Sequence, residues 1–209
     1  MSETLRQSGS SARHDEATAT WADASLEHFV RVYEQSFRAD LCDFLIQAFE
    51  QARHLQHLNG KRRNEALDNS QWTEIDISSL ASRDLLVYVR QLVADSKRRY
   101  EEDIGIVPRL PEPGSCDRLR IKRYLPNAED CFQPHYDSVR RSASRYLVFL
   151  WYLNDIDQGG ETEFLDMNLS VAPRKGRLLM FPPYWMFRHR GNPPVDKPKY
   201  IISTYALWE

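Results

Sequence analysis

Two stretches in the first half of the chain repeat apolar residues at helical spacing. The first predicts an amphipathic helix that starts near Ser36, a candidate N-cap, and runs to about residue 54. The second predicts a longer helix, capped by Ser78 or Ser79, that ends before Gly105. Both patterns leave one polar face, so each helix is expected to pack against another layer of the protein.

Strand patterns occur between these helices and dominate the second half. Short strands are expected at residues 29–33 and 72–77, and beyond residue 104 several prolines exclude further helix. Apolar runs separated by turn signals then follow at 119–125, 146–153, 169–172, 178–181 and 200–207. The run 146–153 is apolar on both faces, which predicts a strand covered on both sides. Many short strands at this spacing are typical of a sandwich or barrel, so we expect helices packed against a β-sandwich.

Composition divides the chain into a tail and one domain. Residues 1–22 are rich in Ser, Thr, Ala and charge, which predicts a disordered tail. Residues 23–209 suffice for a single domain, with mainly helical support at 23–110 and the core that carries the site at 111–209. The polar stretch 55–71, which contains an Asn-Gly turn, is expected to form a mobile lid.

Charge and cysteine usage narrow the class of protein. The net charge is −2, so electrostatics give no reason to expect a nucleic-acid or membrane partner, and the basic run 97–99 is interpreted as a solvated helix end. Cys42, Cys116 and Cys131 lack metal-binding or disulfide spacing, which fits a reducing compartment. No apolar run approaches the ~20 residues of a membrane helix. No secretory signal is recognisable, and we expect a cytoplasmic protein.

The candidate chemistry centres on His135 and Asp137, which are two residues apart. In an extended strand, such positions point to the same face, so an imidazole nitrogen and a carboxylate oxygen would project side by side. His189, from a distant strand, would complete a site of two histidines and one carboxylate, which suits non-haem Fe(II). A His-x-Asp pair alone is a weak signal, so the case depends on its surroundings.

Four signals follow one another in a fixed order in the second half. They are Lys122-Arg123-Tyr124-Leu125-Pro126, His135-Tyr136-Asp137, Gly159-Gly160-Glu161-Thr162, and His189 with Lys199 ten residues later. Their order resembles the prolyl 4-hydroxylase-like branch of the Fe(II)- and 2-oxoglutarate-dependent dioxygenases. The resemblance covers about half of the chain, and the joint pattern is specific although each piece is weak.

The resemblance implies an α+β fold with a double-stranded β-helix (a jelly-roll, cupin-like core) and supporting N-terminal helices. It implies that His135, Asp137 and His189 would ligate Fe(II), and that Lys199 would pair with the distal carboxylate of 2-oxoglutarate. Family positions whose hydroxyl groups contact this co-substrate match Tyr124, Tyr152, Thr162 and Ser203. Each tyrosine could equally be an ordinary core aromatic with a satisfied hydroxyl group.

Two other basic residues compete with Lys199 for the carboxylate. Lys197 is two residues earlier, but Pro198 disfavours a strand that begins there. Arg190 is adjacent to His189 and therefore too close in sequence. Lys199 opens the final apolar strand and is the preferred candidate.

The implied reaction is hydroxylation of an unactivated C–H bond, coupled to decarboxylation of 2-oxoglutarate to succinate and CO2. O2 would be the oxidant and ascorbate an accessory reductant. Because Asp137 is present, halogenation is disfavoured. The alternatives are a metal-dependent cupin dioxygenase that uses no 2-oxoglutarate, against which Lys199 argues, and a non-catalytic jelly-roll binding module, against which the complete ligand set argues.

The sequence leaves the substrate and the oligomeric state open. The family resemblance favours a prolyl or other protein side chain, whereas basic residues around the motifs favour an acidic molecule. These basic residues are Arg118, Arg120, Lys122, Arg123, Arg140, Arg141, Arg145, Arg188 and Arg190. Because no added peptide-binding segment is recognisable, we lean toward a small molecule or a short peptide end.

Overall fold

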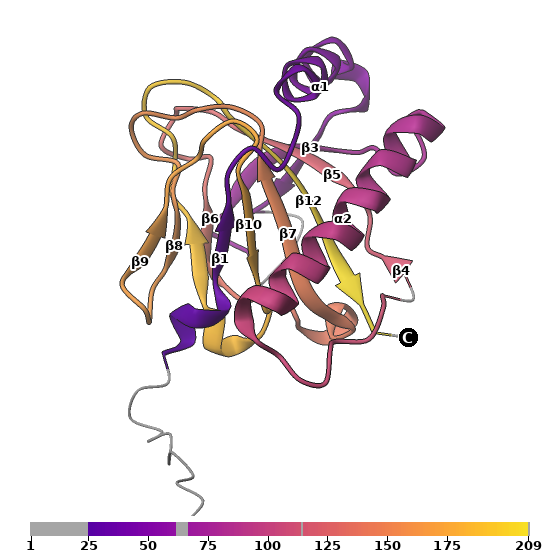
Figure 1. The fold of residues 1–209 in the computed structure, drawn as a ribbon. Helices are drawn as coiled ribbons and strands as arrows, with labels where there is room; N and C mark the ends of the chain where they lie inside the picture. Colours follow the sequence, from indigo (N-terminus) through magenta and orange to yellow (C-terminus); the bar gives the residue numbers. More distant parts are fainter. Residues whose placement is uncertain (1–24, 62–66, 114, 209) are drawn as a thin grey trace, which may run out of the picture.

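The computed structural model describes residues 25–61, 67–113 and 115–208 (Figure 1). The tail predicted at residues 1–22 therefore lies outside the described residues. Among the described residues, the strands form one eight-stranded and one four-stranded sheet, and every pairing is antiparallel. The predicted α+β class and jelly-roll core are confirmed.

The larger sheet holds most of the strands. Its order is β1 (Arg31–Tyr33), β10 (Leu178–Phe181), β7 (Arg145–Tyr152), β12 (Lys199–Leu207), β5 (Arg120–Tyr124), β3 (Gln71–Asp76) and β2 (His57–Gly60), with β4 (Ser115–Cys116) pairing with the end of β12. The smaller sheet has the order β6 (Phe132–His135), β11 (His189–Gly191), β8 (Thr162–Phe164) and β9 (Leu169–Val171). All five apolar runs expected in the second half form strands.

Strand β7 separates two hydrophobic clusters. Phe149 and Trp151 face the helices α1 (Ala39–Gln51) and α2 (Arg83–Ile104), while Val148 and Tyr152 belong to the cluster between the sheets. Figure 1 shows α2 lying across the larger sheet. The strand is covered on both sides, as its apolar pattern predicted, because successive residues of a strand point to opposite faces.

The helix caps differ from those predicted. Helix α1 has Arg38 as its N-cap, and the hydroxyl of Ser36 instead accepts a hydrogen bond from Trp151 Nε1 at 3.1 Å. Helix α2 begins at Arg83 and is capped by Ser82 rather than by Ser78 or Ser79, and the hydroxyl of Ser78 instead accepts from the backbone N–H of Leu119 at 2.8 Å. Both predicted caps are wrong because distant parts of the chain use these hydroxyl groups.

The first half of the chain also adds strands at both edges of the larger sheet, β1 at one edge and β2 and β3 at the other. Part of the stretch 55–71, predicted to be a mobile lid, is thus β2, while residues 62–66 lie outside the described residues. Gly60 has φ +98°, and a Cβ atom there would lie 2.1 Å from the carbonyl oxygen of Ser70. The close approach of these two segments therefore requires glycine.

The basic run at the end of α2 is not uniformly solvated. Lys97 is 1% exposed, and its Nζ donates to Glu101 Oε1 at 2.7 Å and to the carbonyl oxygen of Leu110 at 3.0 Å. The interpretation of Lys97 as a solvated side chain is wrong because the segment after the helix folds over it.

Among the described residues, no helix is long and apolar enough to cross a membrane, and Cys42, Cys116 and Cys131 are free thiols.

The buried pair gives a stability prediction. Lys97→Met leaves Glu101 buried without its cation, so the free energy of unfolding should fall by roughly 3–5 kcal/mol in urea denaturation. Arg98→Met breaks a pair with Asp95 in which both side chains are about half exposed, and its cost should stay below about 1 kcal/mol. Similar small losses for both variants would contradict a structural role for the buried pair.

Candidate metal centre

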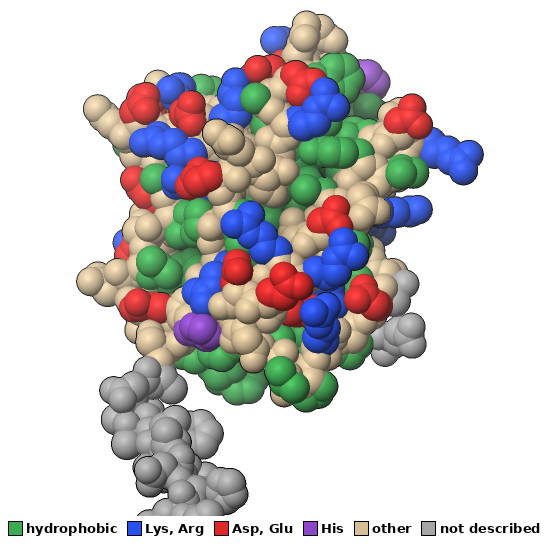
Figure 2. Space-filling model, in the orientation of Figure 1, with side chains coloured by type: hydrophobic (Ala, Val, Ile, Leu, Met, Phe, Trp, Pro, Cys, Tyr) green, Lys and Arg blue, Asp and Glu red, His purple; other side chains and the backbone are tan. Residues whose placement is uncertain are grey.

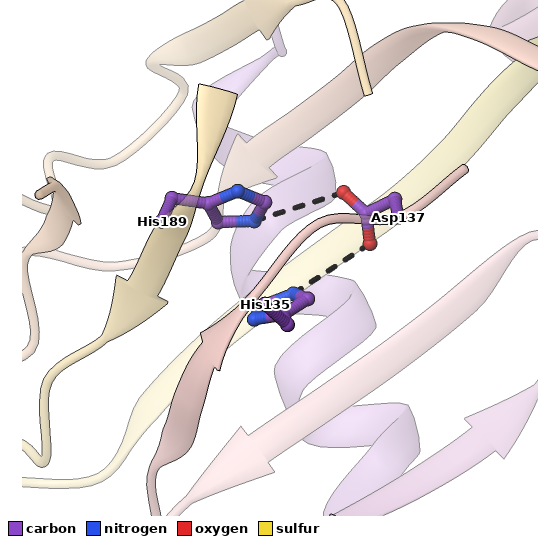
Figure 3. A group of neighbouring side chains, drawn as sticks. All are labelled: His135, Asp137 and His189. Atoms are coloured by element: carbon purple, nitrogen blue, oxygen red, sulfur yellow. Dashed lines mark ion pairs between the residues drawn. The ribbon is translucent and has the colours of Figure 1, made fainter. Parts of the chain in front are cut away.

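The three side chains of the predicted triad converge between neighbouring strands of the smaller sheet (Figure 3). His135 ends β6 and His189 begins β11, and the two residues lie directly opposite each other in the antiparallel pairing. Asp137 follows the end of β6, where its backbone N–H donates to the carbonyl oxygen of Pro183 at 3.0 Å. One potential ligand atom from each of the three side chains lies within 4.8 Å of the others.

The carboxylate stands between the two imidazoles. His135 Nε2 is 3.6 Å from Asp137 Oδ1, and His189 Nε2 is 3.6 Å from Asp137 Oδ2, as the dashed lines of Figure 3 mark. Each histidine uses its other nitrogen on a backbone carbonyl two residues earlier, with Nδ1 distances of 2.8 Å for His135 and 3.0 Å for His189. Because a carbonyl oxygen only accepts, Nδ1 carries the proton and the Nε2 lone pair is available to a metal.

Packing and electrostatics keep these groups in their metal-binding forms. His135 stacks on Phe132 with ring centroids 3.6 Å apart, and Phe181 meets His189 edge-on at 4.8 Å. Burial lowers the pKa of His189 to about 4, with a further contribution from His135. Burial alone would raise the pKa of Asp137, but its interaction with the neighbouring imidazoles of His135 and His189 holds it below its usual value. At neutral pH, His189 is therefore neutral and Asp137 ionised, as ligation requires.

The donor set fits non-haem iron. Two imidazole nitrogens and one carboxylate oxygen on one side of a metal are the ligands of the facial triad, which leaves positions open for other ligands. Within the described part of the chain, this is the one group of three or more histidine, cysteine or acidic side chains that could hold a metal ion. The residue types and their convergence thus agree with the ligand set that the resemblance implied.

A cavity extends from the triad along the inner face of the larger sheet. Alternate residues of three adjacent strands line it, as the period of two in a strand requires. These are Lys199, Ile201, Ser203 and Tyr205 of β12, Lys122 and Tyr124 of β5, and Val148 and Leu150 of β7. The larger sheet also contributes Phe181 of β10, and the smaller sheet and its loops contribute Phe132, Thr162 and Gly191 in addition to the triad.

Lys199 lies deep in this cavity. It is 2% exposed, its Nζ donates to the carbonyl oxygen of Gly160 at 2.9 Å, and it lies 4.5 Å from the ring centroid of Tyr124. Burial lowers the pKa of Lys199 to about 7. Among the described residues, it has no carboxylate within ion-pair distance, so an anionic ligand would be its natural partner.

The competing basic residues lie elsewhere. Lys197 is on the surface, paired with Asp157 at 3.1 Å, and exposed Arg190 pairs with Glu163 at 2.7 Å. The structure therefore brings Lys199, and neither competitor, into the cavity.

The four predicted hydroxyl groups divide into two sets. Tyr124, Thr162 and Ser203 line the cavity, and Tyr124 lies directly opposite Lys199 in the β5–β12 pairing. Tyr152 is fully buried behind this layer, and its hydroxyl donates to Thr162 Oγ1 at 2.7 Å. Tyr152 can thus act on a ligand in the cavity through Thr162, by fixing the direction of that hydroxyl.

Sequence reasoning missed Tyr205 and underrated Lys122. The hydroxyl of Tyr205 donates to Asp137 Oδ1 at 3.0 Å, and Lys122 lines the cavity near Asp137. Both lie an even number of residues from predicted cavity positions on the same strands, Lys199 and Tyr124. Extending that alternation along each strand would have found them.

The basic residues around the motifs are largely neutralised by acidic neighbours. Figure 2 shows acidic and basic side chains interspersed over one face of the molecule. Six of the nine residues on which the acidic-substrate argument depended have a carboxylate within 4 Å. The pairs are Arg118–Asp76, Arg120–Glu74, Arg123–Glu50, Arg145–Asp117, Arg188–Asp166 and Arg190–Glu163. The cluster of basic residues in the sequence therefore does not form an equally large positively charged patch on the folded protein.

Comparison with known proteins agrees with this geometry. Residues 119–207 match the family model described as the 2OG-Fe(II) oxygenase superfamily. A putative prolyl 4-hydroxylase of Acanthamoeba polyphaga mimivirus is 28% identical over 113 residues, which cover 45% of this chain and 45% of that protein. Probable prolyl 4-hydroxylase 11 of Arabidopsis thaliana is 38% identical over 68 residues, which cover 29% of this chain and 22% of that protein.

Solved structures extend the likeness over most of the fold. A Trichoplax adhaerens prolyl hydroxylase in complex with a hypoxia inducible factor peptide fragment has a TM-score of 0.68 at 16% identity, covering 86% of this chain and 84% of that chain. A Pseudomonas putida prolyl-4-hydroxylase has a TM-score of 0.65 at 17% identity, covering 87% of this chain and 94% of that chain.

The match of residues 119–207 to the 2OG-Fe(II) oxygenase superfamily model, with prolyl 4-hydroxylases among the relatives, confirms the resemblance seen in the sequence. The matches span less than half of the length of the two curated relatives.

The triad gives a metal-binding prediction. His135→Ala, Asp137→Ala and His189→Ala should each weaken binding of Fe(II), or of Mn(II) as a redox-stable substitute, by more than about a hundredfold, because loss of a ligand exceeds the 10–100-fold loss typical of outer-shell changes. Anaerobic calorimetric titration measures this. His57→Ala, at an exposed position, is the control and should bind as the wild type does. Wild-type affinity in His189→Ala would refute that residue as the third ligand.

A second prediction concerns the hydroxyl group on Asp137. Tyr205→Phe removes the hydrogen bond to Oδ1 with little change in packing, and metal affinity should fall about 10–100-fold. Tyr200→Phe is the matched control on the same strand, because its hydroxyl bonds Glu50 on the opposite face of the sheet. Equal metal affinities for the two variants would show that Tyr205 does not orient the carboxylate.

Proposed function

We propose that the chain is an Fe(II)- and 2-oxoglutarate-dependent dioxygenase that hydroxylates an unactivated C–H bond and converts 2-oxoglutarate to succinate and CO2. One observation carries the proposal. Two imidazoles and a carboxylate converge at one end of a cavity that also contains a buried lysine, Lys199, without a carboxylate partner in the described chain. A metal ligand set and a buried cation in one cavity suit a co-substrate that is both a chelator and an anion.

In this proposal His135, Asp137 and His189 hold Fe(II), which when bound supplies the activation of O2 at the positions left open by the three ligands. Lys199 binds the distal carboxylate of 2-oxoglutarate. The hydroxyl groups of Tyr124, Thr162 and Ser203 are the proposed further contacts, with Tyr152 orienting Thr162.

The apolar residues Val148, Leu150 and Phe181 keep the cavity poor in water, which strengthens the charge pairing with Lys199. We also propose that ascorbate is an accessory reductant of the enzyme. Measuring turnover with and without ascorbate tests this role.

The two alternative functions are not favoured. A cupin dioxygenase without 2-oxoglutarate has no use for a buried lysine that faces the cavity, and a binding module has no need of a complete ligand set held by Nδ1–carbonyl hydrogen bonds. Retention of metal without any 2-oxoglutarate binding would favour the first alternative.

For the substrate, we propose a prolyl residue in a peptide or protein. The lean toward a small acidic molecule depended on basic residues of which most have acidic partners. The segments beside the ligands carry exposed apolar side chains, Tyr136 and Val139 after β6, and Trp185 and Met186 before β11. Such a rim suits an uncharged peptide segment better than a small anion. The relative from Trichoplax adhaerens was solved with a peptide fragment, which supports the same class.

The location of the protein is a further part of the proposal. We propose the cytoplasm, a reducing compartment, and the free thiols of Cys42, Cys116 and Cys131 support this.

The decisive experiment adds 2-oxoglutarate anaerobically to the Fe(II)-loaded protein and follows the weak visible charge-transfer band of the chelate. Succinate formation is then measured against panels of proline-containing peptides and of small acids. A visible band followed by peptide-dependent succinate supports the proposal. Metal loading without a band would refute it, and turnover of small acids alone would refute the peptide substrate.

Lys199 gives a pH prediction. In the free protein its pKa is lowered to about 7, so above pH 7 it is mostly neutral and must take up a proton when it binds a carboxylate. The affinity for 2-oxoglutarate should therefore fall with rising pH above 7, by at most about tenfold per unit, and calorimetry in buffers of different ionisation enthalpy should detect proton uptake.

Two variants complete this test. Lys199→Met should weaken 2-oxoglutarate binding by more than about a hundredfold, because it leaves a carboxylate buried without a partner. Lys199→Arg keeps a charge that does not titrate in this range, and the binding it retains should not depend on pH between about 7 and 9. The wild-type pH dependence persisting in Lys199→Arg would assign the proton to another group.

A further inference from the structure

Lys122, in the middle of β5, is a buried cation for which the described residues provide no anionic partner. Its side chain is 8% exposed and lines the same cavity as the triad and Lys199. Its contacts in the described structure are aromatic, with Nζ 5.3 Å from the ring centroid of Trp72 and 5.6 Å from that of Phe132. The described residues provide neither a hydrogen bond nor an ion pair to this ammonium group. Burial of an unpaired ammonium is costly, so its position requires an explanation.

The neighbouring carboxylate does not supply that explanation. Glu74 lies directly opposite Lys122 in the β3–β5 pairing, yet no ion pair forms between them. Its Oε1 accepts from Asn59 Nδ2 at 3.1 Å and lies 3.9 Å from Arg120, while its Oε2 accepts from Trp72 Nε1 at 2.5 Å. Glu74 is therefore held by other donors, and it acts on Lys122 through its charge without binding the ammonium group, which lines the cavity.

The strand register places Lys122 between Lys199 and the metal ligands. Lys199 is opposite Tyr124, and Ile201 is opposite Lys122, so the two lysines are diagonal neighbours on one face, about 7–8 Å apart at their Cα atoms. Lys122 is close enough to lower the pKa of Lys199, and Glu74, followed by Asp137, opposes the lowering of the pKa of Lys122 by burial. Its charge thus acts on both ends of the cavity.

We propose that Lys122 is a second cation for the co-substrate and binds the carboxylate at its 2-oxo acid end, while Lys199 binds the distal carboxylate. This inference rests on the proposed function. Two buried ammonium groups on one inner face, neither with a carboxylate partner among the described residues, match the two carboxylates of a dicarboxylic acid. The ammonium group nearer to Asp137 matches the end that meets the metal.

A carboxylate of the primary substrate is the competing ligand for Lys122. The position of the residue argues against it. Lys122 belongs to the middle of a strand beneath the cavity, whereas the exposed apolar residues suited to a substrate lie on the loops that follow β6 and precede β11. A substrate carboxylate would have to reach past the metal ligands to meet it.

The test measures equilibrium binding to protein loaded with Mn(II), without turnover, for three ligands. They are 2-oxoglutarate, pyruvate, which keeps only the 2-oxo acid end, and 4-oxopentanoate, which keeps only the distal carboxylate and a ketone. Lys122→Met should weaken 2-oxoglutarate and pyruvate by the same factor, at least about tenfold, as expected for a lost charge-assisted hydrogen bond, and leave 4-oxopentanoate unchanged. Lys199→Met is the matched control and should give the opposite selectivity.

Several results would overturn the inference. Affinities for 2-oxoglutarate and pyruvate within twofold of the wild type would do so, as would an equal loss for pyruvate and 4-oxopentanoate. Unchanged binding of all three ligands, together with a raised KM for the primary substrate in a separate turnover assay with Fe(II), would assign Lys122 to that substrate instead. If the wild-type protein does not bind 2-oxoglutarate at all, the proposed function is refuted. If the wild type binds it and Lys122→Met binds all three ligands as the wild type does, only the inference about Lys122 is refuted.

Thermal unfolding of the ligand-free variants excludes a merely structural role. Lys122→Met removes an unpaired buried cation, so its melting temperature should equal or exceed that of the wild type. If the role of Lys122 were instead to stabilise the charge of Glu74, then Lys122→Met and Glu74→Gln would both lower the melting temperature without changing the selectivity among the three ligands. Lys122→Gln is the second variant, should the Met variant not fold, and the same selectivity is expected from it.

Discussion

The alternation of side chains along β12 is the constraint on which the site depends. This strand pairs with β5 on one side and β7 on the other, so its register fixes three strands at once. Lys199, Ser203 and Tyr205 face the cavity, while Tyr200 and Ile202 face the helices. A slip of one residue would exchange these two sets, which would bury the cavity's polar groups against the helices. The two-sided apolar packing of the sheet therefore also specifies the chemistry of its inner face.

The sequence allowed prediction of the features that are local. The helices and the five late strands follow from short patterns of residues, whereas the roles of the triad and of Lys199 were implied by the resemblance that the order of the motifs carries. What failed depended on distant partners. Ser36 and Ser78 cap no helix because Trp151 and Leu119 use their hydroxyl groups. No local pattern contains that information.

The same reason explains the residues that were missed or misjudged. Alternation along β12 places Tyr205 on the cavity face, but its contact with Asp137 depends on how the two sheets face each other, which no local pattern specifies. Arg145 and Arg188 were counted as free charges because their partners, Asp117 and Asp166, are 28 and 22 residues away. Charge density along the sequence is therefore a poor guide to surface potential when opposite charges can meet through the fold.

The two faces of the larger sheet divide stability from function. The helix side is filled by large apolar side chains such as Phe149, Trp151 and Ile202, whose burial supplies the driving force for folding. The cavity side holds Asp137, Lys122 and Lys199, groups whose burial opposes folding unless each finds a partner. Asp137 has Tyr205 and two histidines, whereas the lysines have no carboxylate partner among the described residues. A dicarboxylate that entered the cavity would relieve both desolvated cations at once, so binding would stabilise the fold and fix the ligand by the same contacts.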